Sequence, residues 1–305
     1  MKINKQHAMA IGILAAANLS SANAIAELSL EEVVVTAQKR SESMQEVPIA
    51  ISAYNADELA AMDITDVSNI IARTPGLTGS RDADSQSVIN IRGVGTNAFA
   101  PGADNSVGTY FNQVPISRNV GNQGVMDVER IEVVKGPQGT LFGRNTSSGA
   151  ISVTNKAASL GENSASIRVA AGNEGQQTYE FIGNASVSDT LAVRLAARHD
   201  ERDGTYTNAT TGDELNGRDH DQVRLSAQWL VSDATTVSWF WEEVEMQNRW
   251  QMVDAIGVAA SFGIDNGLYN SSVNVDRQPQ QSIDNSFSVL QIDTDLSESL
   301  AFSST

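Results

Sequence analysis

The sequence contains no cysteine and only three histidines, and its acidic side chains outnumber its basic ones by 37 to 20. Without cysteine the chain has no disulfide framework, no thiolate nucleophile and no cysteine metal site. The formal net charge of -17 argues against nucleic acid as a partner, because nucleic-acid binding depends on basic surfaces. No segment after residue 24 is long and apolar enough for a transmembrane helix, so any membrane-embedded part must be a barrel.

The amino-terminal segment has the three parts of a secretory signal peptide. Lys2 and Lys5 form its positive region, residues 8–17 form a short apolar core, and residues 22–24 (Ala-Asn-Ala) form a cleavage site. The apolar core is shorter than the ~20 residues that a membrane-spanning helix needs. We therefore expect residues 1–24 to be a signal peptide and the chain to be exported.

Residues 25–47 contain no aromatic side chain and are expected to form a mobile segment. Within them, Val33–Val35 is the most strand-like run of the chain. The residues that follow, Ser41 to Ser43, do not indicate a hairpin return. A lone strand is marginal in water, so this run needs a partner strand that its neighbours in the sequence are not expected to supply.

Residues 48–158 combine short helical and short strand patterns, which is typical of a small α+β domain. Helices are predicted over 57–62 and, after Thr65 as N-cap, over 66–73. Strands are predicted over 87–92, 107–111, 130–134 and 150–154, with loops rich in glycine and asparagine between them.

From about Ser164 onward, apolar and polar residues alternate in about seven segments, the last of which reaches Thr305. Short turns at 188–189 and 232–233 alternate with long polar connections, the first of them at 199–221. This pattern fits an outer-membrane barrel, but a soluble sandwich with one wet face gives similar alternation, so it leaves both open. Because a plugged barrel needs ~22 strands, we expect the sequence to be the front portion of a longer protein.

Three short motifs offer only weak signals for an enzymatic or metal-binding function. Arg92 to Ala98 contains a GxGxxA outline, but Pro101-Gly102 follows where a nucleotide site requires a helix, and no P-loop motif occurs. His199-Asp200-Glu201 and Asp219-His220-Asp221 bracket a polar loop, which is more typical of solvated charge than of a metal site. No carboxylates stand in a catalytic arrangement. We predict no enzyme activity, no cofactor and no metal site.

The most distinctive segment is residues 127–150, in which a strand runs into a glycine-rich loop (DVERIEVVKGPQGTLFGRNTSSGA). This segment resembles the plug signature of TonB-dependent outer-membrane receptors. The loop residues that carry the resemblance are Gly136, Pro137, Gly139, Gly143 and Gly149. Ser87 to Gly93 (SVINIRG) is similar to another plug motif of that family, and Glu31 to Ala37 (EEVVVTA) resembles its energy-coupling box.

The resemblance implies an α+β plug domain followed by an antiparallel transmembrane β-barrel, here its first strands. The implied organisation is a signal peptide at 1–24, a mobile periplasmic segment with the TonB box at 25–47, a plug domain at 48–158, and barrel strands at 159–305. It also implies the bacterial outer membrane as location, with lipid around the barrel. A passive porin would lack the box and plug, and a secreted β-sandwich binding module remains the alternative from another class.

In this family the box adds as a strand to an edge of TonB, the inner-membrane-anchored partner that delivers energy. The resemblance assigns TonB binding to Glu32, Val33, Val34, Val35, Thr36 and Ala37. This would answer the question of the missing partner strand, because the partner would be another protein. The β-branched residues of the run suit such a strand.

The resemblance further implies a plug held in the barrel and a solute captured from outside. We expect a plug–barrel latch at Arg92, Arg130 and Lys135, with acidic partners on the barrel wall beyond Thr305. Substrate contacts are expected at the plug apices, at Arg81, Asn97, Phe99 and Arg118. The expected cargo is a ferric siderophore, with cobalamin, carbohydrate or another metal chelate as alternatives.

Overall fold

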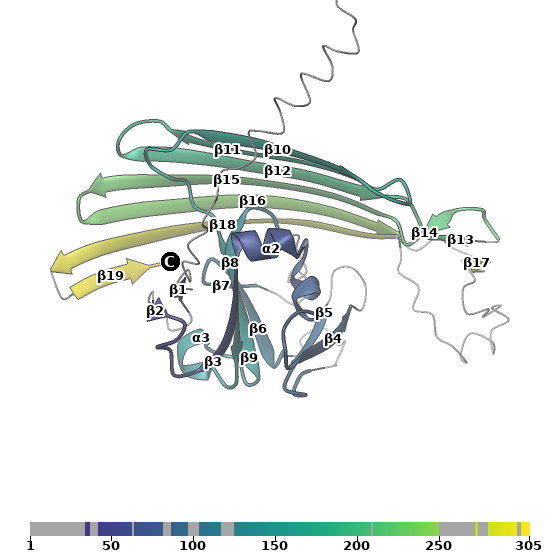
Figure 1. Cartoon of the computed structure of the whole chain (residues 1–305), viewed down its shortest axis with the longest axis horizontal. Coiled ribbons are helices and arrows are strands. Elements are labelled where there is room, and N and C mark those ends of the chain that lie inside the picture. Colours follow the sequence, from purple (N-terminus) through teal and green to yellow (C-terminus); the bar gives the residue numbers. More distant parts are fainter. Residues whose placement is uncertain are drawn as a thin grey trace, which may run out of the picture. The chain divides into compact units, whose positions relative to one another are not determined.

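The computed structural model describes residues 34–36, 42–62, 64–81, 87–96, 104–116, 125–208, 210–249, 272–273, 280–297 and 300–305 (Figure 1). The chain divides into two compact units, Met1–Glu32 and Val33–Thr305, and every described residue belongs to the second. The predicted signal peptide lies outside the described residues. None of the helices in the described part has the length and apolar character that a bilayer crossing requires.

A five-stranded sheet forms the centre of the amino-terminal half. Its strands, in spatial order, are β3 (Ala50–Asn55), β8 (Val128–Lys135), β9 (Gly149–Asn155), β6 (Val107–Phe111) and β7 (Val114–Ile116). Neighbours are antiparallel except β6 and β9, which run parallel. A separate hairpin contains β4 (Leu77–Arg81) and β5 (Ser87–Ile91). All four strands predicted between residues 87 and 154 are present.

Two helical segments precede this sheet's central strands. Helix α2 (Ala56–Ala61) begins at a capping box, in which the Asn55 side chain accepts from the Glu58 N–H (2.8 Å) and the Glu58 carboxylate accepts from the Asn55 N–H (2.9 Å). The second predicted helix is wrong in length, since only a single 3-10 turn, η1 (Val67–Ile70), forms. The segment has few strong helix formers, and the following Pro75 disfavours helical backbone at Thr74.

The core of this half consists of apolar side chains from the sheet, from α2 and from η1. Phe287, which belongs to the second sheet described below, packs against the same core. The buried members are Leu59, Ile64, Val67, Ile70, Leu77, Ile91, Val107, Phe111, Val125, Val128, Ile131, Val133, Ile151 and Val153.

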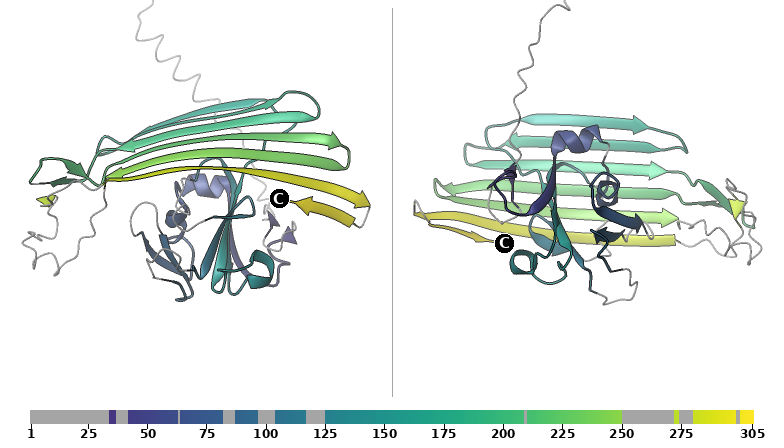
Figure 2. Two further views of the ribbon diagram at one scale, coloured as in Figure 1. Left: turned by 180° about the vertical axis from the view of Figure 1, so that it is seen from behind. Right: turned by 60° about the horizontal axis from the view of Figure 1, so that its bottom comes forward.

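A second, seven-stranded sheet contains the strands predicted in the carboxy-terminal half (Figures 1 and 2). In order they are β10 (Ser164–Ala171), β11 (Gln177–Ser186), β12 (Leu191–Arg202), β15 (Arg218–Ser232), β16 (Thr235–Arg249), β18 (Gln280–Ser297) and β19 (Leu300–Ser304). Every neighbouring pair is antiparallel.

The two faces of this sheet differ in polarity, as the alternation predicts. On one face large apolar side chains are exposed, including Ile167 (77%), Trp229 (51%) and Phe302 (52%). The opposite face contains buried polar side chains such as Arg194 and Arg224. An exposed apolar face with a polar inner face is the pattern of a lipid-facing barrel wall and not of a sandwich, whose apolar face is buried.

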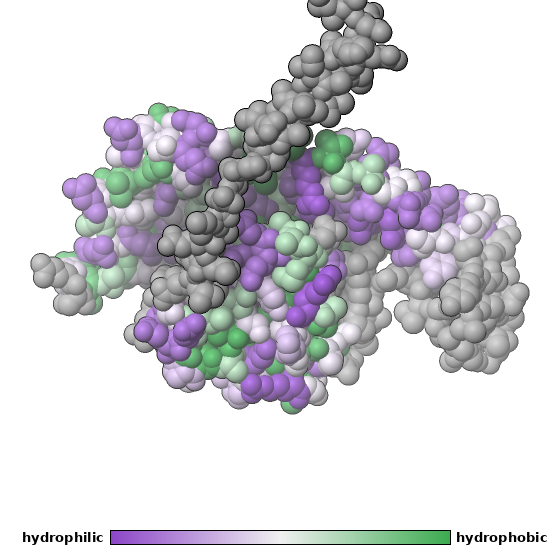
Figure 3. Space-filling model, in the orientation of Figure 1, coloured by the Kyte–Doolittle hydropathy of each residue, from purple (hydrophilic) through white to green (hydrophobic). Residues whose placement is uncertain are grey.

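The polar stretch at 199–221, predicted as a loop, is largely strand. β12 continues to Arg202 and β15 begins at Arg218. Between them β13 (Tyr206–Asn208) and β14 (Glu214–Leu215) form a hairpin, and β17 (Ser272–Val273) runs parallel to β13. Figure 3 shows hydrophilic residues gathered at this end of the sheet. Apolar alternation missed these extensions because the strands continue with polar residues on both faces.

Candidate functional site

The predicted box forms a strand within the chain. Val34–Val35 is strand β1, and it pairs in antiparallel register with β2 (Glu42–Ser43). Val35 is fully buried. The expectation that no neighbouring segment pairs with this run is therefore wrong. Ser41 to Ser43 gave no strand signal because a two-residue pairing depends on tertiary contacts more than on local propensity.

Thr36, the residue after β1, is held by a buried carboxylate of the plug. Its N–H donates to Glu132 Oε1 (2.6 Å), and its hydroxyl lies 3.2 Å from the same oxygen. Arg130 donates from Nε to Glu132 Oε1 (3.1 Å) and from Nη2 to the Thr36 hydroxyl (3.2 Å). Glu132 has no exposed surface. We call Thr36, Arg130 and Glu132 the box clasp.

The clasp explains why a charged residue can occupy the middle of the plug sheet. A buried carboxylate is costly unless charge and hydrogen bonds compensate it. Here Glu132 has both, because Arg130 supplies the charge and Thr36 supplies a backbone donor. Of the box residues assigned from the sequence, Val34, Val35 and Thr36 are described; Glu32, Val33 and Ala37 lie outside the described residues.

The three cations predicted to latch the plug lie in different surroundings. Arg130 belongs to the box clasp and also pairs with Glu129. Lys135 donates to the Ser52 hydroxyl (2.8 Å), and burial, followed by the positive charge of Arg92, lowers the pKa of Lys135. In the part of the chain that the structure describes, no barrel acid pairs with any of them, and a latch through these residues stays a prediction.

The structure contains a different connection between plug and barrel wall. Here the plug supplies the carboxylate and the barrel strands supply the arginines, the reverse of the prediction. The plug carboxylate of Asp127 accepts two hydrogen bonds from Arg194 of β12, both of 2.6 Å, and both side chains are almost fully buried. Arg224 of β15 donates to the Met126 carbonyl (2.7 Å) and pairs with Glu242 (2.7 Å). We call Asp127, Arg194, Arg224 and Glu242 the wall latch.

Sequence reasoning missed the wall latch, although a signal was present. Arg194 and Arg224 are large charged residues in the alternating strands. Both lie on the face opposite the apolar one, where a barrel wall meets the plug. Buried arginines require acceptors, so partners on the plug were to be expected. Asp127 is the residue that begins the plug signature segment and has a left-handed backbone (φ 49°), a conformation that Asp tolerates better than most residues.

The glycine-rich loop between β8 and β9 needs glycine at three of its four predicted glycine positions. Gly136, Gly143 and Gly149 have positive φ angles. At Gly149 an added Cβ would lie 2.2 Å from a β8 carbonyl oxygen, so glycine also permits the close approach of β9 to β8. Gly139 begins the short helix α3 (Gly139–Phe142) and has nothing within 4 Å of a hypothetical Cβ.

The predicted substrate contacts are largely beyond what the structure describes. Arg81 ends β4, but its side chain is not among the described ones. Asn97, Phe99 and Arg118 lie outside the described residues. Their roles in substrate binding stay predictions.

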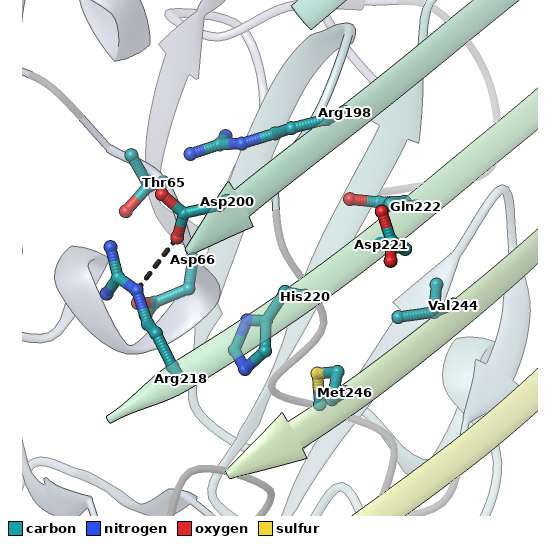
Figure 4. Close-up of a pocket in the computed structure, with 10 residues that line it drawn as sticks. All are labelled: Thr65, Asp66, Arg198, Asp200, Arg218, His220, Asp221, Gln222, Val244 and Met246. Carbon is teal, nitrogen blue, oxygen red and sulfur yellow. Dashed lines mark ion pairs between the residues drawn. The ribbon is translucent and has the colours of Figure 1, made fainter. Parts of the chain in front are cut away.

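The two His/Asp motifs are split between the faces of the barrel sheet. His199, Asp219 and Asp221 gather on the outer face, with 2.9 Å between His199 Nδ1 and Asp221 Oδ1. All three side chains are partly exposed. Asp200 and His220 lie on the face toward the plug, where they line a pocket with Arg198 and Arg218 of the wall and with Thr65 and Asp66 of the plug (Figure 4).

The comparisons with known proteins agree with this architecture. Residues 43–150 match the family model of the TonB-dependent Receptor Plug Domain. An iron-regulated outer membrane virulence protein of Vibrio cholerae is 29% identical over 185 residues, which cover 57% of this chain and 28% of that protein. The vitamin B12 transporter BtuB of Vibrio vulnificus is 27% identical over 183 residues, with the same two coverages.

A solved structure shows the same fold. The ferric yersiniabactin uptake receptor FyuA from Yersinia pestis matches with a TM-score of 0.72 and 18% identity, over 84% of this chain and 39% of that one. The chain spans 28% of the length of the two relatives above. With its five-stranded sheet, its glycine-rich signature loop and its second sheet with one exposed apolar face, the chain contains a plug domain like that of the TonB-dependent receptors and has the fold of such a receptor over most of its length.

Proposed function

We propose that this chain is the plug-bearing part of a receptor that imports a scarce solute, a ferric siderophore, into the periplasm with energy from TonB. Support comes from relatives named for iron regulation and for ferric yersiniabactin uptake. Members of the family are receptors and transporters, and we propose the same role, without enzyme activity, for this chain.

The observation that carries the proposal is the box clasp. A strand that another protein captures by β-augmentation must be withheld when no cargo is bound and released when it is. The withheld state is supported by two contacts, because β2 covers one edge of β1 and the clasp holds the residue that follows it. We propose that cargo binding changes the plug at the clasp and so frees β1.

The wall latch supports the proposal that movement of the barrel wall is transmitted to the plug. Asp127 directly precedes β8, and β8 carries both Arg130 and Glu132 of the clasp. A displacement of the wall around Arg194 therefore moves the strand that holds the box. Cargo bound between plug and wall would act on the box by this short connection.

A proline substitution tests the coupling step. In the full-length receptor, Val34→Pro removes a backbone donor and prevents strand addition. We expect uptake of the ferric siderophore to be lost while its binding survives. Val34→Ala keeps the donor and serves as the matched control, with uptake retained. Unchanged uptake in Val34→Pro would refute the assignment of the box.

Cobalamin is the second candidate cargo, because one relative is a vitamin B12 transporter. Growth assays that supply either a ferric siderophore or cyanocobalamin as the limiting nutrient separate the two. Growth that depends on this receptor only with cyanocobalamin would replace the iron proposal while leaving the TonB-coupled mechanism intact.

A further inference from the structure

Charge is sorted by face where β12 and β15 extend past the apolar band. Residues 198–202 read Arg-His-Asp-Glu-Arg and residues 218–221 read Arg-Asp-His-Asp. The strand period of two places Arg198, Arg202 and Arg218 on the face toward the plug. The acids Glu201, Asp219 and Asp221 and the imidazole of His199 fall on the outer face.

This inner arginine group contains a cross-strand pair of like charges. Arg202 lies directly opposite Arg218 in the register of β12 and β15. Like charges in that position repel each other, so acceptors beside them stabilise the arrangement. Arg202 donates to the Asn216 carbonyl, and the Asp200 carboxylate lies 2.8 Å from Arg218 Nε.

The guanidinium of Arg198 can donate hydrogen bonds to a ligand. Among the described residues, no hydrogen bond or ion pair engages its side chain, although Glu180 and Gln222 lie opposite it on the neighbouring strands. Arg218 forms an ion pair with Asp200 through Nε (2.8 Å), and among the described residues no hydrogen bond engages its guanidinium. Both side chains line one pocket (Figure 4).

Three acids line the pocket, and each is already engaged by a group of the protein. Asp221, whose carboxylate turns to the outer face, lies 2.9 Å from His199 Nδ1. Asp200, 6% exposed, accepts from the Thr178 hydroxyl (2.8 Å) as well as pairing with Arg218. Asp66, 8% exposed, accepts from the backbone N–H of Asn69 (3.1 Å). The pocket therefore has unused donors on two arginines, while its carboxylates are bonded.

The pocket lies on the side from which cargo arrives. It sits at the strand ends far from the tight turns at 188–190 and 232–234, and next to the long connection that contains β13 and β14. In barrels of this class the long connections are extracellular and the short turns periplasmic.

We propose that this pocket is a subsite for an anionic oxygen group of the cargo, a carboxylate bound by Arg198 and Arg218. The planar guanidinium fork matches a carboxylate in two parallel hydrogen bonds. A chain with a net charge of -17 repels anions as a whole, so an anionic cargo requires a local cationic group of this kind. The inference rests on the proposed function and narrows the cargo to an anionic chelate.

Binding to the purified full-length receptor tests the subsite by isothermal titration. The probes are ferric citrate as a carboxylate chelate, a ferric catecholate as an anionic chelate without carboxylate, and ferrichrome as a neutral one. We expect ferric citrate to bind and Arg198→Gln to weaken it at least tenfold. Arg198→Lys should recover part of the loss, because it keeps the charge without the fork. Arg144→Ala, which removes an exposed plug arginine outside the pocket, should bind as the parent does.

Arg218→Gln provides a second variant, which should also weaken the binding of ferric citrate. For both variants, a gel mobility that changes on heating shows that the barrel is folded. The inference is overturned if Arg198→Gln binds ferric citrate as tightly as the parent, or if only the catecholate or ferrichrome binds. In those cases the proposed iron uptake still stands. If none of the three chelates binds, the subsite and the iron proposal both fall.

Discussion

The box clasp predicts that one buried carboxylate controls the accessibility of the box. We consider Glu132→Ala in a receptor that also carries Val35→Cys as a reporter, since these 305 residues contain no cysteine. Val35 is fully buried in the parent, so a thiol there reacts only when β1 detaches. The measurement is the rate of modification by a soluble maleimide without cargo.

The expected size follows from the contacts that are lost. Glu132→Ala removes the charged acceptor of the Thr36 N–H and of Arg130. A hydrogen bond to a charged group contributes ~1.5–3 kcal/mol. The two-residue pairing of β1 with β2 adds little, so the detached population should rise by ~10-fold to 150-fold, at 1.4 kcal/mol per tenfold. Glu132→Gln keeps an oxygen acceptor and should give an intermediate rate.

Glu129→Ala is the matched control. Glu129 also pairs with Arg130 from β8, but its side chain is 47% exposed. Exposed ion pairs contribute only ~0–1 kcal/mol, so the rate should change by less than about fivefold. A separate reporter, Ile151→Cys in the buried β9, should stay protected and so exclude unfolding of the plug. An unchanged rate in Glu132→Ala would refute the clasp.

Three further predictions concern the rest of the structure. Asp127→Asn and Arg194→Gln should each destabilise the plug against urea by ~3 kcal/mol, and the double variant should lose much less than the sum; full additivity would contradict the wall latch. Leu225→Arg on the outer face should cost ~2–4 kcal/mol in folding into lipid vesicles, and no cost would argue against lipid contact there. Gly149→Ala should expose the plug to protease whereas Gly139→Ala should not, and equal sensitivity would contradict the strain at Gly149.

Sequence patterns predicted the barrel strands better than the box region. The alternation from Ser164 onward predicted every strand of the seven-stranded sheet. Successive side chains of a strand point to opposite faces, and the two faces of this sheet meet different surroundings, which imposes a period of two. β3 was missed, since Ala50–Asn55 has a weak apolar pattern and its place at the sheet edge depends on pairing with β8. β2 was missed for a similar reason.

The functional contacts were the least predictable part. Motifs identified Arg130 and the glycine-rich loop, but not that Arg130 would share Glu132 with the box, since the residues concerned are 96 positions apart. The sequence also could not show that the wall latch has its arginines on the barrel strands and a carboxylate on the plug. Sequence order cannot show which arginine of a strand meets which plug carboxylate, because that depends on the register and on the placing of one sheet against the other.

The sorting of charge between the faces of β12 constrains how this strand can change during evolution. Deleting or inserting one residue ahead of Arg194 would turn the arginines toward lipid and the leucines toward the plug for the remainder of the strand. Changes of two residues would preserve both faces. Length variation among close homologues should therefore come in pairs within this strand, while odd steps accumulate in the connection that follows it.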